Sequence, residues 1–325
     1  MIGNEIQDTE KKMTGGRVHA ICVSEKRGTE KHAVEKASFK INHGIVGDAH
    51  AGNWHRQVSL LSYDKVLDFN KRGADVKDGA FGENLVVEGI DFRSLPVGTV
   101  LKCNDVILKM TQIGKECHSH CAIYKRMGEC IMPKQGVFAE VIKEGTITVG
   151  DMMSVELPPA DAPLRAAVVV MSDKASKGER EDESGPKAEE ILKGKGYEVV
   201  ERNVISDDPD RIKKELIRLA DQRQVDLIIT SGGTGMSVRD NTPEATLAVC
   251  DRQVPGISEA IRYESMKYTD RAMLSRGVSA MRGKTLIVNL PGSPKAVKES
   301  LDIILGPLDH GLRIAKGLTG ECARS

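Results

Sequence analysis

The chain has 325 residues, with 47 Lys and Arg balanced by 47 Asp and Glu, so its formal net charge is zero. A neutral chain lacks the basic surface that binds nucleic acid, and an aromatic content of 3% offers few rings on which bases could stack. No apolar run is long enough to cross a membrane, and the length exceeds that of one hydrophobic core. We therefore expect two domains that handle small molecules.

The N-terminal half begins with a polar stretch, residues 1–16, which contains no signal-peptide core. We expect a disordered tail on a cytoplasmic protein. Short strand-like segments follow, separated by Gly or Pro, at residues 17–24, 57–61, 84–88, 99–102, 106–111 and 147–155. Short strands with frequent turns predict an antiparallel β barrel or sandwich over residues 17–157.

Three motifs of this half resemble the MOSC domain, which is named for the C-terminal part of molybdenum cofactor sulfurase. They read GIVGDAHAG at residues 44–52, FGENL at residues 81–85 and GKECH at residues 114–118. The spacing between them and the closing segment, residues 136–151, also agree with that family. The resemblance implies a barrel-like, mostly β domain that binds the molybdenum cofactor or carries sulfur to it.

Cysteines supply the chemistry of this half, because Cys117, Cys121 and Cys130 lie within fourteen residues and are interleaved with His118 and His120. A zinc site lacks a second cysteine pair at the usual distance, and a chain without a secretion signal disfavours a disulfide. The MOSC resemblance implies a reactive thiolate at Cys117, which a protonated His118 would stabilise. A cysteine packed as a small hydrophobe is the alternative. Four further cysteines have apolar or terminal surroundings and are expected to be structural: Cys22, Cys103, Cys250 and Cys322.

A proline-rich stretch, ELPPADAP at residues 156–163, separates the two halves, because proline interrupts both helices and strand ladders. We place a linker at residues 158–163 and a second domain at residues 164–322. Four strand-like runs in this domain cover residues 167–171, 197–205, 225–229 and 286–290. Glycines open the ends of the last two runs, and ligands of open α/β sheets gather at such strand ends.

The run at residues 225–229 leads into TSGGTGMSVRDNTPE at residues 230–244. The amides of its three glycines can point at an anion, and a cation and a carboxylate, Arg239 and Asp240, follow. Thr242 is expected to cap the next helix, and Pro243 to begin it. The loop is neither a P-loop nor G-x-G-x-x-G, so ordinary ATPase and dinucleotide interpretations are disfavoured. A glycine-rich turn in which Arg239 and Asp240 pair with each other remains the alternative.

Two further strand ends carry candidate ligands. After residues 286–290, Ser293 is placed to cap a helix that Pro294 begins, which leaves Gly292 and the helix N-terminus open to negative charge. After residues 197–205, Asp208 is the expected N-cap of a helix that begins near residue 209. Asp207 then has no capping task and is either a metal ligand or a solvated loop acid.

These segments, in this order, resemble Mog-type molybdopterin adenylyltransferases over residues 164–322: SDKAS, DESG, the acid pair, TSGGTG with RDNTPEAT, LSR and NLPGSPKA. The resemblance implies a three-layer α/β fold with a mainly parallel sheet, usually trimeric. Such proteins move AMP from Mg-ATP to the terminal phosphate of molybdopterin and release pyrophosphate. By position, the two catalytic, Mg²⁺-binding carboxylates fall on Asp207 and Asp240. Ser206 stands where the family often has proline.

The same resemblance implies binding of substrate or nucleotide by thirteen further positions: Ser172, Asp173, Ser231, Gly232, Gly233, Thr234, Gly235, Arg239, Ser275, Arg276, Pro291, Gly292 and Ser293. Together the two resemblances predict a molybdenum cofactor biosynthesis protein that uses Mg²⁺ and ATP on molybdopterin, with Cys117 as the reactive residue of the N-terminal half. Pyridoxal phosphate is not expected.

The expected partners are copies of the chain itself, as a homotrimer through the C-terminal domain, and other proteins of cofactor biosynthesis. Neither nucleic acid nor a membrane is an expected partner. Two other classes share the C-terminal fold: nucleotide pyrophosphatases related to competence-damage proteins, and non-catalytic scaffolds such as gephyrin. The presence of both Asp207 and Asp240 favours catalysis over a scaffold, and the MOSC-like half favours the molybdenum pathway over a pyrophosphatase.

Overall fold

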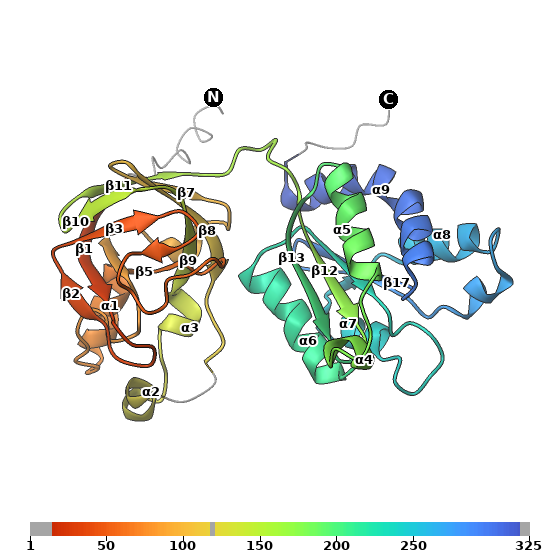
Figure 1. Ribbon diagram of the computed structural model, residues 1–325, viewed down its shortest axis with the longest axis horizontal. Helices are drawn as coiled ribbons and strands as arrows, with labels where there is room; N and C mark the ends of the chain where they lie inside the picture. Colours follow the sequence, from red (N-terminus) through yellow and green to blue (C-terminus); the bar gives the residue numbers. More distant parts are fainter. Residues whose placement is uncertain (1–14, 118–120, 319–325) are drawn as a thin grey trace, which may run out of the picture. The chain divides into compact units, whose positions relative to one another are not determined.

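The computed structural model describes residues 15–117 and 121–318. The chain divides into two compact units between Pro159 and Ala160 (Figure 1). The first strand begins at Gly16, and residues 1–14 of the predicted tail lie outside the described residues.

Seven strands of the N-terminal unit close into a barrel. In spatial order they are β11 (Met152–Glu156), β7 (Val100–Cys103), β8 (Val106–Ile113), β9 (Val137–Lys143), β5 (Val58–Ser62), β6 (Leu85–Glu88) and β1 (Gly16–Val23), and β1 pairs back onto β11. A short strand, β2 (His32–Val34), extends the sheet beside β1. A separate sheet joins β10 (Gly145–Thr148), β3 (Lys36–Lys40) and β4 (Gly44–Ile45). The sequence predicted either a barrel or a sandwich, and the structure shows a barrel.

Two details of this unit differ from the expectations. The β5 and β6 pair is parallel, because helix α1 (Tyr63–Lys71) carries the chain back between them, as a parallel connection requires. The segment predicted as one strand, residues 147–155, is divided between β10 and β11 by a turn in which the Asp151 amide donates to the Thr148 carbonyl at 3.1 Å. The remaining elements are the helical turn η1 (Phe92–Ser94), α2 (Ala122–Met127) and α3 (Met132–Gln135).

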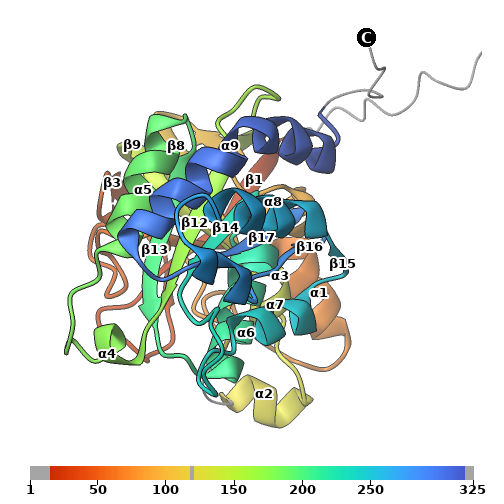
Figure 2. The ribbon, with the colours of Figure 1, turned by 90° about the vertical axis from the view of Figure 1, so that its right-hand side faces the viewer.

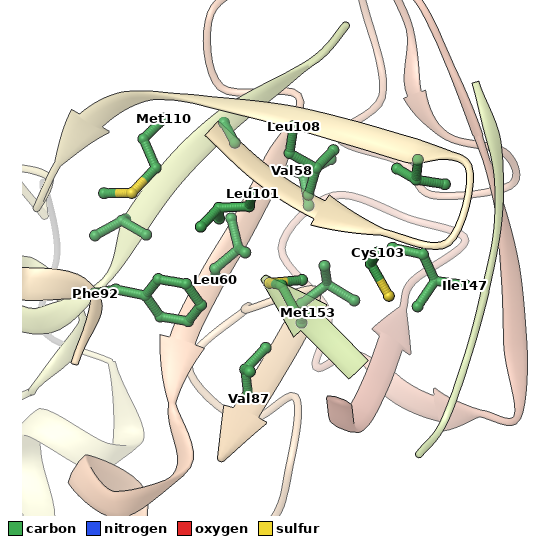
Figure 3. Close-up of a cluster of buried hydrophobic side chains, with 14 of the residues drawn as sticks. Val58, Leu60, Val87, Phe92, Leu101, Cys103, Leu108, Met110, Ile147 and Met153 are labelled. Atoms are coloured by element: carbon green, nitrogen blue, oxygen red, sulfur yellow. The ribbon is translucent and has the colours of Figure 1, made fainter. Parts of the chain in front are cut away.

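Apolar side chains from most of these strands meet inside the barrel (Figure 3). Leu60 from β5, Leu101 from β7, Leu108 from β8 and Phe92 from η1 are all fully or almost fully buried. Each such side chain contributes about 1.5–3 kcal/mol when it leaves water. A second cluster beneath α1, α2 and α3 covers the outer face near β5 and includes Phe69, Phe81 and Phe138, among others.

The C-terminal unit has a six-stranded mixed sheet. In spatial order its strands are β13 (Glu198–Ile205), β12 (Arg165–Met171), β14 (Leu227–Ser231), β17 (Thr285–Leu290), β16 (Ser279–Arg282) and β15 (Arg252–Gln253). The first four strands are parallel, while β16 and β15 pair antiparallel at one edge. The four strands predicted from sequence form the parallel part. The predicted mainly parallel sheet is mixed because the hairpin at Gly283 adds β16 beside β17.

Helices cover both faces of this sheet, which makes three layers (Figure 2). Alternate residues of β12 explain why: Val168 and Val170 pack into one cluster with α5 (Ser184–Gly194), α8 (Pro255–Ser265) and α9 (Pro294–Lys316). Val169 and Met171 pack into the other with α6 (Pro209–Ile217) and α7 (Thr242–Val249). The remaining helical segments are α4 (Asp173–Ser176), the π-helical turn η2 (Arg218–Gln222) and the 3₁₀ turn η3 (Asp270–Leu274). No helix in the described part of the chain is long and apolar enough to cross a bilayer.

Candidate active site

Four neighbouring strand ends build the candidate site in the C-terminal unit. Because β13, β12, β14 and β17 are parallel neighbours, the loops that follow them all leave the same edge of the sheet. The segments that leave these strand ends are residues 206–208, 172–173, 232–241 and 291–293, and Asp173 is also the first residue of α4. The topology therefore brings together the predicted residues of separate sequence motifs.

The glycine-rich loop has a backbone conformation that glycine adopts readily and other residues do not. Gly232 has a φ of +100° and Gly233 a φ of +64°, and a Cβ on either would overlap a neighbouring oxygen: the Met171 carbonyl or Oγ1 of Thr242. The prediction that the Gly232 amide faces an anion is wrong. That amide donates to the Leu290 carbonyl at 3.1 Å, because it continues the ladder between β14 and β17.

Thr242 holds this loop instead of capping α7. Its hydroxyl donates to the Gly232 carbonyl at 3.0 Å, and its amide donates to the Gly233 carbonyl at 3.2 Å. The helix itself begins at Thr242, with Asn241 in the capping position and Pro243 in its first turn. The expected cap is therefore displaced by one residue, because the threonine side chain has a tertiary partner.

Arg276 also braces the loop, although the sequence predicted it to bind substrate. Its Nε donates to the Gly235 carbonyl at 2.6 Å, its Nη2 to the Asp240 carbonyl and its Nη1 to the Glu244 carboxylate. Its backbone amide donates to the Thr234 carbonyl at 2.9 Å. The guanidinium thus contacts the loop at two carbonyls and helix α7 at one carboxylate. Ser275, its neighbour, accepts a 3.4 Å hydrogen bond from the amide of Gly277.

Asp207 and Asp173 exchange hydrogen bonds between the ends of β13 and β12. The amide of Asp173 donates to Oδ2 of Asp207 at 2.9 Å, and the amide of Asp207 donates to Oδ1 of Asp173 at 3.1 Å. The other oxygen of Asp207, Oδ1, lies 3.4 Å from where a Cβ of Gly233 would be. Among residues 15–117 and 121–318, nothing donates a hydrogen bond to this Oδ1. One carboxylate oxygen therefore faces the glycine loop unengaged.

Burial raises the pKa of Asp207, and the nearby charges of Asp173 and Asp240 raise it further. The hydrogen bond from the Asp173 amide and the charge of Arg239 oppose this rise. Asp240 is fixed by its own loop, since its Oδ2 accepts from the Ser237 amide at 2.8 Å. The charge of Asp240 thus acts on the half-buried carboxylate of Asp207.

Arg239 pairs with an acid, as the alternative interpretation allowed, but the acid is Asp173 and not its neighbour Asp240. Its Nε and Nη2 donate to Oδ2 of Asp173 at 3.0 and 2.5 Å. These hydrogen bonds lower the pKa of Asp173 below its ordinary value. The pair spans two loops and is solvent-accessible.

A cavity of about 320 Å³ adjoins the loop. Four predicted residues line it: Ser172, Ser231, Gly292 and Ser293. A Cβ on Gly292 would lie 3.3 Å from the Cα of Gly232, so the cavity wall and the glycine loop are in contact. The predicted caps are confirmed here: Ser293 accepts from the Ala296 amide at 3.2 Å, and Asp208 from the Arg211 amide at 2.8 Å. The Ser231 hydroxyl donates to the Pro291 carbonyl at 3.1 Å.

The cavity has a wall that the sequence reasoning did not assign. Residues 180–184, which follow α4, form this part of the lining and bring Arg180, Asp182 and two further acids to the pocket. Asp182 is held by a 3.0 Å hydrogen bond from the Gly185 amide. The signal was present as the DESG motif, but an acidic run in a loop is equally typical of a solvated surface.

In the N-terminal unit, Cys117 and Cys121 are exposed and Cys130 is half-buried. Cys22 and Cys103 are buried, which raises the pKa of their thiols to about 12 and about 11. His118, His120 and Cys322 lie outside the described residues. Within the described ranges, no group of three or more His, Cys, Asp or Glu residues is placed to hold a metal ion by itself.

The motifs at residues 44–52 and 81–85 meet inside the N-terminal unit. Asp48 and Lys31 form an ion pair whose side chains are 2% and 1% exposed. Oδ2 of Asp48 also accepts from Nδ2 of Asn84 at 3.0 Å and from the Ser24 amide at 3.2 Å. A buried pair needs such extra hydrogen bonds to offset its desolvation, so this network ties the two motifs together.

Comparison with known proteins agrees with this division. A family described as "Probable molybdopterin binding domain" matches residues 167–310, and the MOSC domain family matches residues 47–154. Molybdopterin adenylyltransferase of Helicobacter pylori (strain J99) is 40% identical over 156 residues, which are 47% of this chain and 89% of that protein. The Escherichia coli (strain K12) protein of the same name is 42% identical over 142 residues, 43% of this chain and 72% of that protein.

Among solved structures, MoaB of Thermus thermophilus, titled a molybdopterin biosynthesis enzyme, is 45% identical with a TM-score of 0.46, and the match covers 47% of this chain and 97% of that one. The chain matches more than two thirds of the length of both adenylyltransferases. The chain belongs to the molybdopterin adenylyltransferase family, with a MOSC domain fused in front of that domain.

Proposed function

We propose that the C-terminal unit transfers AMP from Mg-ATP to the terminal phosphate of molybdopterin. In this reaction a phosphate oxygen of molybdopterin bonds to the α-phosphorus of ATP, the bond from that phosphorus to the bridging oxygen breaks, and pyrophosphate leaves. The observation that carries the proposal is the unengaged Oδ1 of Asp207, which faces the glycine loop beside a 320 Å³ cavity. Membership of the adenylyltransferase family supports it independently.

The carboxylates fit a Mg²⁺ ion that is shared with the substrate. Mg²⁺ prefers oxygen ligands and is usually bound by one or two carboxylates, with substrate phosphates and water completing the shell. Asp207 and Asp240 offer two carboxylates. Within the described ranges no third acidic residue is grouped with them as a further metal ligand, so the remaining ligands would come from substrate and water. When bound, the ion neutralises charge on the phosphates of ATP.

Two anion-binding places lie next to each other, which suits a reaction between two phosphorylated molecules. The amides of Gly233 and Gly235 belong to the loop beside Asp207, while Gly292 and the capped N-terminus of α9 border the cavity. We assign the triphosphate to the first place and the molybdopterin phosphate to the second. Holding both in one geometry lowers the entropic part of the barrier.

Incubation of the purified chain with molybdopterin and Mg-ATP tests this function. We expect adenylylated molybdopterin in the mass spectrum and one pyrophosphate released for each. Hydrolysis of dinucleotides without any requirement for molybdopterin would instead identify a pyrophosphatase. Tight molybdopterin binding with no adenylylated product and no pyrophosphate would identify a scaffold.

For the N-terminal unit, we propose that Cys117 binds the cofactor or carries sulfur as a persulfide. Its exposure supports this role, since Cys22 and Cys103 of the same unit are buried. In the sulfur-carrying form, the Cys117 thiolate attacks the outer sulfur of a donor persulfide, and the donor leaves as a thiolate. Mass spectrometry after treatment with a low-molecular-weight persulfide should show one added sulfur atom on Cys117, and none in Cys117→Ser.

We also propose that the chain forms a trimer through its C-terminal unit. Large apolar side chains are exposed there on α8 and η3 and between them: Tyr263, Tyr268, Met273 and Leu274 are 53–66% exposed. Apolar side chains gathered on one surface are typical of a protein interface. Light scattering of the full chain should give three times the monomer mass, and replacement of Tyr263 and Met273 by Ser should yield monomers. A monomeric unchanged chain would reject this assignment without affecting the proposed reaction.

A further inference from the structure

The carboxylate of Asp173 has a task that helix capping does not explain. Helix α4 is already capped by Ser172, whose hydroxyl accepts from the Ala175 amide at 3.2 Å. The two oxygens of Asp173 point elsewhere: Oδ1 accepts from the Asp207 amide, and Oδ2 accepts from Arg239. This side chain therefore joins the loop after β13 to the loop after β14.

We propose that Asp173 is a positioning residue for the metal site: it fixes Asp207 and ties Asp207 to the loop that carries Asp240. The inference rests on the proposed function, because Asp207 and Asp240 are the metal ligands of that function.

The first tie determines which oxygen of Asp207 is available. The Asp173 amide engages Oδ2 of Asp207, while the Asp173 carboxylate holds the Asp207 amide, so both the backbone and the side chain of Asp207 are fixed. Oδ1 is then left facing Gly233. Without the carboxylate of Asp173, the Asp207 backbone would lose its partner and the orientation of Oδ1 would be less restricted. A ligand oxygen that must be reoriented binds its ion more weakly.

The second tie holds the glycine-rich loop across the site. Residues 236–238 of this loop extend into solvent, with Val238 95% exposed, so packing does little to fix them. Arg239 follows directly and reaches back to Asp173, and Asp240 is its neighbour in the chain. Arg276 braces the same loop through the Gly235 and Asp240 carbonyls. Arg276 thus holds the backbone of Asp240 directly, while Arg239 fixes the adjacent position through Asp173.

The two ties can be separated by substitution. In Asp173→Asn the amide oxygen still accepts from the Asp207 amide, but the NH₂ group cannot accept from Arg239. Arg239→Ala also removes only the second tie. Asp173→Ala removes both. Asp210→Ala is the matched control, because Asp210 is an exposed acid three residues after Asp207 whose carboxylate pairs with Lys213.

The test is Mn²⁺ binding to the full chain, measured by the loss of the free-ion electron paramagnetic resonance signal with no ATP or molybdopterin present. Asp173→Ala should bind Mn²⁺ about tenfold more weakly, as expected from the loss of one fixing hydrogen bond. Asp173→Asn and Arg239→Ala should stay within about threefold of the unchanged chain, and Asp210→Ala should match it.

Normal Mn²⁺ affinity in Asp173→Ala would overturn the inference. Equal weakening in Asp173→Asn and Asp173→Ala would reject the tie to Asp207 and assign the whole effect to the ion pair with Arg239. Asp207→Asn separates this failure from that of the proposed function. If Asp207→Asn loses Mn²⁺ binding and Asp173→Ala does not, only the positioning role is rejected. If the unchanged chain and Asp207→Asn bind Mn²⁺ equally, or neither binds it, the metal assignment itself is rejected.

Discussion

The hydroxyl of Thr242 donates a 3.0 Å hydrogen bond to the Gly232 carbonyl and occupies the place where a side chain on Gly233 would lie. The first residue of α7 thus closes the glycine-rich loop from behind. The loop can keep its shape only while position 233 has no Cβ.

We expect Gly233→Ala to displace the loop and lower ATP affinity by at least about tenfold. Two effects combine: a φ of +64° is unfavourable for alanine by about 1–2 kcal/mol, and the new Cβ overlaps Oγ1 of Thr242. Gly196→Ala is the matched control, since Gly196 has a φ of +86° but no atom within 4 Å of its Cβ position. The Gly196→Ala chain should lose about the same 1–2 kcal/mol of stability that a positive φ costs alanine. Calorimetry should show that its affinity for ATP is unchanged. Normal ATP binding by Gly233→Ala would show that the loop is only a turn.

Replacement of Asp207 or Asp240 by Asn should reduce pyrophosphate release about 100-fold or more. Each change keeps the shape of the side chain but removes a negative charge from the proposed metal site, and metal stabilisation of phosphoryl transfer amounts to several kcal/mol. Molybdopterin binding should persist. Asp208→Asn removes a charge from the adjacent residue while keeping a good N-cap for α6, so it should be nearly as active as the unchanged chain. Equal activity in all three variants would reject the carboxylate assignment.

Alkylation by iodoacetamide at pH 6.5 should modify Cys117 clearly faster than Cys103 or Cys250. Burial raises the pKa of both of those thiols to about 11, so almost none of either is thiolate at this pH. Cys121 is the stringent comparison, because it is exposed in the same segment. A reactive Cys117 should also outpace Cys121, which can be read by peptide mass spectrometry over time. Equal rates at Cys117 and Cys121 would mean that exposure alone explains the modification.

Glu83 should make the N-terminal unit less stable as the pH rises. Its side chain is fully buried, burial raises its pKa to about 7, and it accepts from the amides of Gly79 and Phe81 at 2.8 and 3.0 Å. In the folded chain Glu83 therefore keeps a proton that it loses in the unfolded chain, where its pKa is about 4.5. Between these two values the folded state binds more protons, so the free energy of unfolding falls with increasing pH, by roughly 2–3 kcal/mol in total.

Urea unfolding followed by the fluorescence of Trp54 measures this effect, since Trp54 is the only tryptophan of the chain and lies in the N-terminal unit. The unchanged chain should lose more stability between pH 5 and pH 7.5 than Glu83→Gln, which cannot titrate at this position. Glu83→Gln should itself be less stable at pH 5, because one of the two amides loses its acceptor. The same pH dependence in both chains would assign it to other groups.

Much of the local structure could be predicted because its causes lie within a few residues. Ser293 and Asp208 cap their helices as expected, since a cap requires only an acceptor three residues before an amide. Three apolar runs form the central parallel strands β12, β14 and β17 of the C-terminal sheet, because burial on both faces demands continuous apolar sequence. The more polar run at residues 197–205 forms β13 at the edge of the sheet. The strand Ser279–Arg282 was missed, since it is short and carries no comparable run.

The amino-acid sequence by itself therefore determined the family, the strand ends that build the candidate site, and the residue types present there. Only the tertiary structure decided what those residues contact. In the folded chain the Gly232 amide donates to the Leu290 carbonyl, and Arg276 donates to the Gly235 carbonyl of the loop. Asp173 accepts from Arg239 through its side chain and donates to Asp207 through its amide. These partners are 34 to 66 residues apart along the chain, so no local pattern records them: strand order and register bring them within hydrogen-bonding distance.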